Sequence, residues 1–327
     1  MKCTNKRIPV LLSVMILFLL SGCKSASIPF AYKLNNDVSA FQVASSYQRE
    51  VKMAAFADAL CVGNSDVTAE TSVDMSQATA AALFDVNKST IIYAKNLHNR
   101  LYPASLTKVL TAVVALKNAS PDDIITVTDG ARITESGATL CGLEAGDTLT
   151  MNQALHALLI QSANDAANAI AIHVAGSVEA FARLMNEEAR ALGATNSNFV
   201  NPHGLSDDNH YTTVYDLYLI FNEAINYEMF REIIHTGSYE TIYQNSNGED
   251  KEMSFSTTNF FLRGTVSSPD KVTVIGGKTG TTNAAGNCLI LLSKDTAGNP
   301  YISVILQSKE RQLMYEEMVD MLEEIYN

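Results

Sequence analysis

Two serine–lysine combinations are the residues of this chain best suited to chemistry. Ser105 and Lys108 stand in Ser-Leu-Thr-Lys, Ser162 and Asn164 stand in Ser-Ala-Asn, and Lys278 begins a Lys-Thr-Gly string. A serine hydroxyl is a poor nucleophile until a base removes its proton. A lysine whose pKa is lowered by burial or by a nearby positive charge is such a base. The three strings together predict acyl transfer without a catalytic histidine.

The S-x-x-K spacing alone is weak evidence, because it also occurs at Ser21 and at Ser268. Only Ser105 opens a helical pattern, residues 105–117, just after a proline. Residues at i and i+3 share a helix face, about 5–6 Å apart at Cβ, so Lys108 is expected to reach the serine. The backbone N–H of Ser105 at a helix start also suits it to bind an oxyanion.

Ser162 and Asn164 fall between two predicted helices, residues 151–161 and 165–174. One interpretation is a helix cap, which serine and asparagine supply well. The catalytic interpretation has Ser162 relay a proton between a lysine and the leaving amine. Asn164 then holds either the substrate amide or the Lys108 side chain. The two interpretations are compatible, because a loop pinned by caps positions a site well.

The Lys-Thr-Gly string follows a β-type run and a pair of glycines. A strand edge pairs with an extended peptide, and glycine permits close approach. Lys278 and Thr279 are therefore candidates to hold a substrate carboxylate, with the N–H of Thr281 joining that of Ser105 in an oxyanion hole. The alternative is a glycine-rich turn. A similar string at His235 lacks the lysine.

The surrounding pattern predicts one sheet assembled from distant segments, with helices between them. Apolar and β-branched runs predict strands at residues 80–84, 90–95, 271–276, 288–293 and 302–307, and helical spacing marks residues 310–326. Residues 76–327 are long enough for a single α/β unit with a substantial core. Residues 23–75 lack sustained periodicity and are interpreted mainly as a tether, with a candidate helix at residues 37–60.

The first residues have the character of an export signal. Three basic residues lie among the first seven residues. The apolar run at residues 8–20 is short for a membrane span but has the length of a signal-peptide core. The run ends in Leu-Ser-Gly-Cys, which resembles a bacterial lipobox. Cleavage before Cys23 and lipid attachment to its thiol are the expected processing. An ordinary cleaved signal or an uncleaved anchor is the alternative, and both also export the domain.

Composition excludes several partners. The formal net charge is −12, and removal of residues 1–22 leaves 20 basic against 35 acidic residues, a charge of −15. This argues against nucleic acid and against electrostatic adhesion to anionic lipid, so membrane attachment is expected to rest on the lipid alone. Cys61, Cys141 and Cys288 allow one disulfide at most. No cysteine pair or histidine motif has metal-ligand spacing, and no metal or organic cofactor is expected.

The chain resembles the D-alanyl-D-alanine carboxypeptidases of the low-molecular-mass penicillin-binding proteins over most of residues 78–327. Besides the three motifs, the resemblance rests on residues 142–150, 158–166, 201–205, 210–213 and 216–217. It implies a β-lactamase/transpeptidase-like α+β fold, in which helices and an all-helical subdomain flank a central antiparallel sheet. It also implies that Ser105 is acylated, Lys108 accepts the proton, Ser162 relays it and Lys278 binds substrate.

The implied substrates are peptidoglycan stem peptides ending in D-Ala-D-Ala, with β-lactams as covalent inhibitors. The implied location is the outer face of the bacterial cytoplasmic membrane. Many relatives continue into a β-rich C-terminal domain with a terminal anchor, whereas this chain stops after an acidic helix. We therefore expect the N-terminal lipid to serve as the anchor. The string around Thr257 departs from the family pattern, so no carboxylate-binding arginine is assigned, Arg263 included.

Three other functions remain open. A D,D-endopeptidase that cuts crosslinks would use the same site. A class A β-lactamase needs a deacylating glutamate in an E-x-x-L-N string, and Glu223-Ala-Ile-Asn226 lacks that pattern. We therefore expect penicillin to acylate Ser105 and to remain attached. A non-catalytic penicillin-binding scaffold is the third alternative, although every expected catalytic residue is present.

Overall fold

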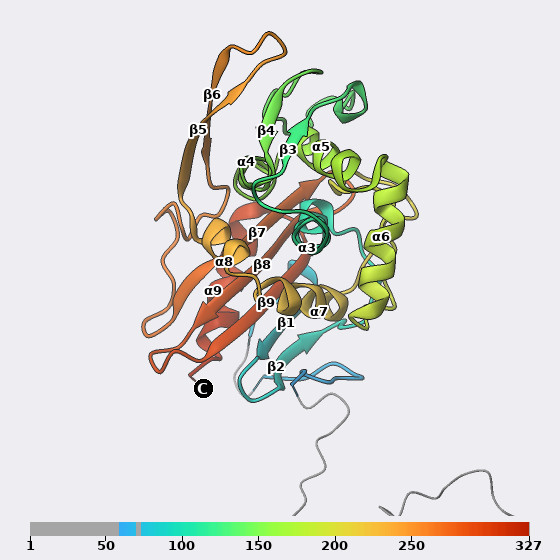
Figure 1. The fold of residues 1–327 in the computed structure, drawn as a ribbon. Coiled ribbons are helices and arrows are strands. Elements are labelled where there is room, and N and C mark those ends of the chain that lie inside the picture. The colour runs from blue at the N-terminus through green and yellow to red at the C-terminus, as the bar shows by residue number, and fades with distance from the viewer. Residues whose placement is uncertain (1–58, 70–72, 327) are drawn as a thin grey trace, which may run out of the picture. The chain divides into compact units, whose positions relative to one another are not determined.

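A five-stranded antiparallel sheet lies at the centre of the fold (Figure 1). Strands from the N-terminal end of the domain pair in it with strands from the C-terminal end. The prediction of one sheet assembled from distant segments is therefore confirmed. The strands in that order are β2 (Thr90–Lys95), β1 (Ala78–Asp85), β9 (Pro300–Ser308), β8 (Gly286–Lys294) and β7 (Thr273–Thr282).

The computed structural model describes residues 59–69 and 73–326. All of them belong to one compact unit, residues 55–327. The predicted signal peptide, Cys23 and nearly all of the candidate helix at residues 37–60 lie outside the described residues. Among the described residues, no helix has the length and apolar character needed to cross a bilayer.

Strand β1 is buried on both faces, which explains its uninterrupted apolar sequence. Ala80, Ala82 and Phe84 belong to the core on one side of the sheet, while Ala81 and Leu83 belong to the core on the other. Side chains alternate across a strand, so a strand covered on both faces needs apolar residues at every position. The apolar sequence of β1 alone therefore indicates that each face of the sheet is covered by another layer of the domain.

Helices from distant parts of the chain cover the two faces. Helices α7 (Val214–Ala224) and α8 (Glu228–His235) pack on one face, and α9 (Arg311–Glu323) packs on the other (Figure 1). The apolar side of α9 consists of residues at helical spacing, including Met314, Met318 and Leu322. The helix predicted at residues 310–326 is confirmed.

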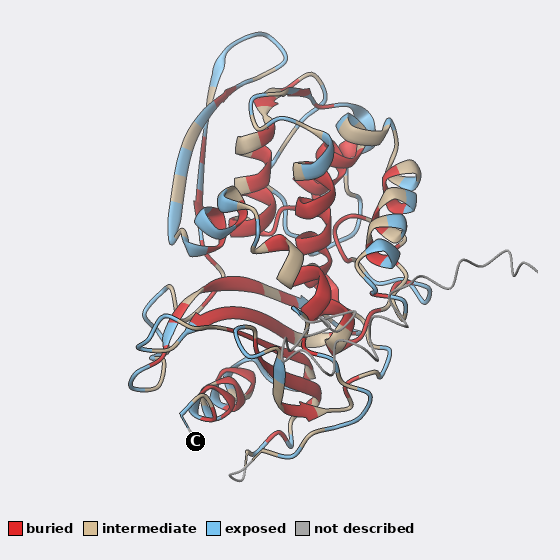
Figure 2. Cartoon of the chain, turned by 60° about the horizontal axis from the view of Figure 1, so that its bottom comes forward, coloured by how far each residue is buried: buried red, intermediate tan, exposed pale blue. Residues whose placement is uncertain are grey.

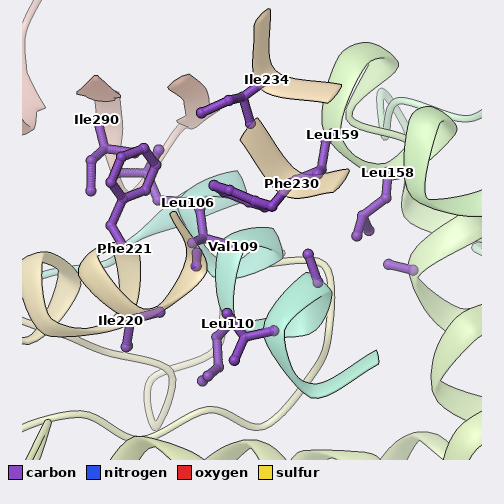
Figure 3. Close-up of a cluster of buried hydrophobic side chains, with 14 of the residues drawn as sticks. Leu106, Val109, Leu110, Leu158, Leu159, Ile220, Phe221, Phe230, Ile234 and Ile290 are labelled. Atoms are coloured by element: carbon purple, nitrogen blue, oxygen red, sulfur yellow. The ribbon is translucent and has the colours of Figure 1, made fainter. Parts of the chain in front are cut away.

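Helix α3 (Thr107–Asn118) follows a 3₁₀ turn, η1 (Ala104–Leu106), and lies deep in the domain. Val109 of this helix and Leu106 of the preceding turn pack among apolar side chains from α7, from α8, from residues 157–161 and from the sheet (Figure 3). Fully burying one such side chain contributes about 1.5–3 kcal/mol relative to leaving it exposed. The turn that carries Ser105 is thus fixed to the core through its immediate neighbours.

The part of the domain above the central sheet combines helices with a second sheet, so the expectation of an all-helical subdomain is wrong. Its helices are α4 (Met151–His156), the π-helical η3 (Ala157–Gln161), α5 (Asn164–Ala175) and α6 (Val178–Ala191). A four-stranded sheet, which the sequence pattern did not predict, contains β3 (Ile124–Thr126), β4 (Thr148–Thr150), β5 (Ser238–Gln244) and β6 (Asp250–Ser256). Figure 2 shows that burial concentrates in the central sheet and nearby helices, whereas hairpin β5–β6 is largely exposed.

The folded domain begins earlier than residue 76, where the predicted tether ends. Cys61 is fully buried, its N–H donates to the hydroxyl of Tyr218, and Val67 pairs with Ala94 at the edge of β2. Residues 59–69 are therefore part of the domain. Their partners lie far away in sequence, so local composition could not reveal this packing.

Candidate active site

The Ser105–Lys108 pair lies at the junction of η1 and α3. The Nζ of Lys108 is 3.0 Å from Ser105 Oγ, and the lysine side chain is fully buried. The same Nζ also donates to Asn164 Oδ1 and to the carbonyl oxygen of His203, both at 2.7 Å. A neutral amine has two N–H groups and one lone pair, which matches two acceptors and one hydroxyl. This geometry suits Lys108 to act as a base toward Ser105.

The electrostatics favour a neutral Lys108. Burial, together with the positive charge of Lys278, holds the pKa of Lys108 well below its usual value, while Asp165 opposes the shift. Burial lowers the pKa of Lys278 to about 7. Among the described residues, no ion pair neutralises either ammonium. Two buried lysines in one site therefore disfavour each other's protonation.

Ser162 lies in the loop between η3 and α5. Its Oγ is 3.0 Å from the Nζ of Lys278, which also donates to the carbonyl oxygen of Thr279 at 2.9 Å. Ser162 has a φ of 66°, in the left-handed region that residues other than glycine rarely adopt. Such strain is maintained only where the surroundings over-determine the backbone, and it is common at functional sites.

Asn164 and Asp165 attach this loop to a second loop, residues 139–143. The N–H of Asn164 donates to the carbonyl oxygen of Thr139 at 2.8 Å. The carboxylate of Asp165 accepts the backbone N–H groups of residues 141, 142 and 143 in that loop, at 3.0, 2.8 and 3.1 Å, and also that of Ala166 at 3.0 Å. Hydrogen bonds to a charged acceptor are worth more than neutral ones. Asp165 thereby fixes the backbone beside Asn164.

Strand β7 brings the Lys-Thr-Gly string against the turn that carries Ser105. A Cβ at Gly280 would lie 2.9 Å from the backbone nitrogen of Ser105, so this close approach requires glycine. The hydroxyls of Thr279 and Thr258 are 2.5 Å apart. The string is therefore part of a strand, as the substrate-binding interpretation requires, and the glycine-rich turn is excluded.

The end of β7 also lies near a cation that the sequence analysis missed. Arg311, at the start of α9, donates to Thr281 Oγ1 at 3.3 Å, and that hydroxyl in turn donates to Asn287 at 3.2 Å. Arg311 is exposed and lies 6.0 Å above the ring of Phe260. No local motif marks it, because its position depends on how β8 and β9 return the chain to β7.

The loop of residues 201–210 packs against the nucleophile turn, the turn that carries Ser105. Gly204 has a φ of 87°, and a Cβ there would lie 1.9 Å from the carbonyl oxygen of Ala104, itself at a φ of 48°. His210 Nε2 is 2.8 Å from Thr107 Oγ1. Burial lowers the pKa of His203 to about 3 and that of His210 to about 4. Both imidazoles are thus neutral at physiological pH.

Cys61, Cys141 and Cys288 are all free thiols, so none of the three forms the disulfide that composition allowed. The structure brings six of the predicted site residues into one region: Ser105, Lys108, Ser162, Asn164, Lys278 and Thr279. The seventh, Thr281, lies on the same strand as Lys278, β7. Cys23 lies outside the described residues.

Three comparisons place these features among known proteins. A family model described as D-alanyl-D-alanine carboxypeptidase, of the peptidase S11 group, matches residues 66–310. The D-alanyl-D-alanine carboxypeptidase DacF of Bacillus subtilis is 33% identical over 252 residues, 75% of this chain and 61% of the relative. The D-alanyl-D-alanine endopeptidase of Escherichia coli is 28% identical over 65% of this chain and 66% of its own length.

The crystal structure of the Streptomyces K15 DD-transpeptidase superposes with a TM-score of 0.70. It is 27% identical and covers 79% of this chain and 98% of its own. The match confirms the expected β-lactamase/transpeptidase-like fold. The chain spans about 61% of the length of the Bacillus relative. The family model covers most of the described domain, including all three motifs, and the chain belongs to the D-alanyl-D-alanine carboxypeptidase family.

Proposed function

We propose that this protein is a serine D,D-carboxypeptidase that removes the terminal D-alanine from peptidoglycan peptides. One observation carries the proposal: two buried lysines each bond to a different serine, Lys108 to Ser105 and Lys278 to Ser162, both at 3.0 Å. The first pair supplies a nucleophile with its base. The second supplies a proton path to the leaving amine.

In the first half-reaction Ser105 Oγ attacks the carbonyl carbon between the two D-alanines, and Lys108 takes the hydroxyl proton. The N–H groups of Ser105 and Thr281 are the proposed donors to the oxyanion. The C–N bond then breaks, and the leaving amine takes the proton that Lys108 accepted, relayed through Ser162 beside Lys278, so that Lys108 is neutral again. Free D-alanine departs, and the shortened peptide remains as an ester on Ser105.

In the second half-reaction water attacks the ester while Lys108 accepts its proton. The ester C–O bond breaks, the proton returns to Ser105 Oγ, and the peptide leaves with a new carboxylate. The substrate carboxylate is assigned to Lys278, Thr279 and Arg311, which gather cationic and hydroxyl donors at β7. A free carboxylate on the leaving residue is what such donors recognise.

Intact mass after incubation with penicillin tests the proposal, with Ser105→Ala as the matched variant. A lasting adduct on the unchanged protein only, together with D-alanine release from a peptide ending in D-Ala-D-Ala, is the expected result. Hydrolysed drug without an adduct would indicate a β-lactamase, and intact drug without an adduct would refute the assigned site. Adduct formation without peptide cleavage would favour a scaffold, while preferential cleavage of a crosslinked peptide would favour the endopeptidase.

We also propose that the mature protein is a lipoprotein anchored through Cys23 on the outer face of the cytoplasmic membrane. The lipobox-like string and the apolar run before it support this location. Cells labelled with a radioactive fatty acid should incorporate it into the full chain but not into Cys23→Ala. Equal labelling of the two proteins would refute the anchor.

A further inference from the structure

Two isoleucines on the four-stranded sheet are exposed without a role in the active site. Ile124 of β3 is 59% exposed and Ile242 of β5 is 56% exposed. They are two of the five large apolar side chains that stand exposed in the part of the chain that the structure describes. Neither belongs to the apolar core, and hairpin β5–β6 lies at the outside of the domain (Figure 1). Single exposed apolar residues are ordinary in proteins, but a group of them on one face indicates a binding surface.

The strand register places the two isoleucines on the same face of the sheet. Ile124 lies opposite Thr150 in the pairing of β3 with β4. Thr148 of β4 lies opposite Gln244 of β5, two residues after Ile242. Directly opposite residues of antiparallel strands point to the same face, as do residues two apart along one strand. Neighbouring strands are about 4.8 Å apart, so the two isoleucines flank Thr150 about 10 Å from each other. We call the face that carries both side chains the isoleucine face.

Carboxylates surround Ile242 on the isoleucine face. Glu252 lies directly opposite it in β6, Glu240 lies two residues before it in β5, and Asp250 lies diagonally across from it. All three carboxylates are exposed, and within the described residues none of them forms an ion pair. Strands β3, β4 and β5 contain no lysine or arginine, and Lys251 of β6 points to the opposite face. A hollow of about 570 Å³ is lined by both strands of the hairpin, including Glu240, Ile242 and Glu252.

The charge of this face selects among possible occupants. A second copy of the chain would bring carboxylates against carboxylates, and anionic lipid or nucleic acid would meet the same repulsion. A cationic partner instead gains attraction from the carboxylates while it covers the two isoleucines. The face is about 14 Å wide over four strands and about 23 Å long over the seven residues of β5, or about 320 Å². Because a stable interface buries about 800 Å² on each partner, the contact is a transient one.

We propose that the isoleucine face docks a protein partner through an extended segment that places lysine or arginine side chains on either side of an apolar centre. The apolar centre covers Ile124 and Ile242, and the cations bind the carboxylates around Ile242. The face contains none of the residues assigned to catalysis, so docking leaves the nucleophile and its base untouched. This interaction lies outside the proposed carboxypeptidase reaction and recruits the enzyme to its partner.

Fluorescence anisotropy of dye-labelled peptides with the full chain tests the proposal. The probe has the sequence Lys-Thr-Ile-Thr-Ile-Thr-Lys with both ends blocked, so that its lysines and isoleucines share one side of an extended chain. In the first control peptide serines replace the isoleucines, and in the second glutamates replace the lysines. The probe should bind at least about fivefold more tightly than either control. A rise in salt from about 50 to about 300 mM should weaken its binding, because salt screens exposed charges.

Variants of the protein assign the binding to the isoleucine face. Ile242→Ser removes the apolar centre, and the double variant Glu240→Gln with Glu252→Gln removes two carboxylates beside it. Each should weaken binding of the probe at least about fivefold. The double variant Glu316→Gln with Glu323→Gln removes the same charge from the exposed side of α9 and should bind the probe normally. Penicillin acylation should stay within about twofold in every variant, which shows that the domain is folded.

Equal weakening by the two double variants would mean that net charge alone attracts the peptide, and it would overturn the docking face. Equal affinity for the probe and for the serine peptide, or no binding of any peptide, would overturn it as well. Sedimentation velocity of the full chain completes the test. A dimer that Ile242→Ser dissociates would assign the face to a second copy and overturn the cationic partner. The acylation measurement tests the proposed carboxypeptidase site separately, so the two proposals fail independently.

Discussion

Lys108 and Lys278 are two lysine side chains buried in one site, and the positive charge of Lys278 lowers the pKa of Lys108. Each amino group bonds to a different serine, Lys108 to Ser105 and Lys278 to Ser162. This arrangement makes the base strength of Lys108 depend on the protonation of Lys278, whose own pKa is about 7. The two groups therefore titrate as a coupled pair.

Removal of the charge at position 278 should shift the pH dependence of acylation. Below about pH 7 Lys278 is charged and lowers the pKa of Lys108, so in Lys278→Met the pKa of Lys108 rises. The rising limb of penicillin acylation against pH should move up by about one to two pH units. Lys278→Arg, which keeps a charge there, should not move it upward. An unmoved limb in the methionine variant would contradict the coupling.

Asp165→Asn should act in the opposite direction on the same profile. The carboxylate opposes the lowering of the Lys108 pKa, so its removal should move the rising limb to lower pH. It also removes a charged acceptor for the three backbone N–H groups of residues 141–143, at a cost of about 2–3 kcal/mol in unfolding free energy. Urea unfolding and acylation against pH measure the two effects.

The exposed Asp129→Asn, outside both loops, is the matched control and should change neither quantity. A loss of stability in Asp165→Asn with an unshifted profile would leave Asp165 as a purely structural residue. A shifted profile at full stability would instead show that its charge matters and its hydrogen bonds do not.

The sequence predicted those parts of the site whose geometry is local. Ser105 and Lys108 are one turn apart, and helix geometry alone brings them together. The β1, β8 and β9 runs were identified because strands buried on both faces are continuously apolar. The strand at β7 was predicted only as residues 271–276, because its second half is the polar Lys-Thr-Gly string.

The parts that were missed depend on long-range contacts. Lys108 is held by a backbone carbonyl, that of His203, and a carbonyl acceptor has no side-chain signature in sequence. Arg311 lies beside Thr281 only because β8 and β9 bring the chain back to the end of β7. Hairpin β5–β6 and the burial of Cys61 were missed for the same reason. Contacts of this kind depend on the completed fold rather than on local propensity.

Gly204→Ala should displace the turn that carries Ser105, through backbone strain and through steric overlap of the new Cβ. Gly298→Ala is the control that separates these two causes. Both glycines have nearly the same φ, 87° and 89°, so both substitutions introduce similar backbone strain, about 1–3 kcal/mol. Only at Gly204 would the new Cβ overlap another atom, the carbonyl oxygen of Ala104, because nothing lies within 4 Å at Gly298.

We expect Gly204→Ala to lower penicillin acylation at least tenfold, at a protein concentration corrected for the folded fraction, since Ala104 precedes Ser105 directly. Gly298→Ala should lose stability alone and acylate at the normal rate. Equal acylation by both variants would show that the contact between Gly204 and Ala104 does not position the nucleophile.

His203 and His210 should make the domain sensitive to acid. Both pKa values are lowered in the folded protein, to about 3 and about 4, from 6.5. Between those values and pH 6.5 the unfolded chain binds more protons than the folded one, so stability falls as pH falls through this window. Because a pKa difference of 1 between the two states corresponds to about 1.36 kcal/mol, His210 alone accounts for up to about 3 kcal/mol.

Urea unfolding at pH 7 and pH 4.5 measures this loss, and His210→Gln should reduce the difference between the two pH values. Glutamine retains a donor for Thr107, whose hydroxyl lies 2.8 Å from the imidazole, so the turn at Ser105 should persist. His235→Gln, at an exposed imidazole, is the control and should leave the difference unchanged. If His210→Gln loses as much stability in acid as the unchanged protein, the acid sensitivity arises elsewhere, and the buried imidazole only fills space beside the nucleophile helix.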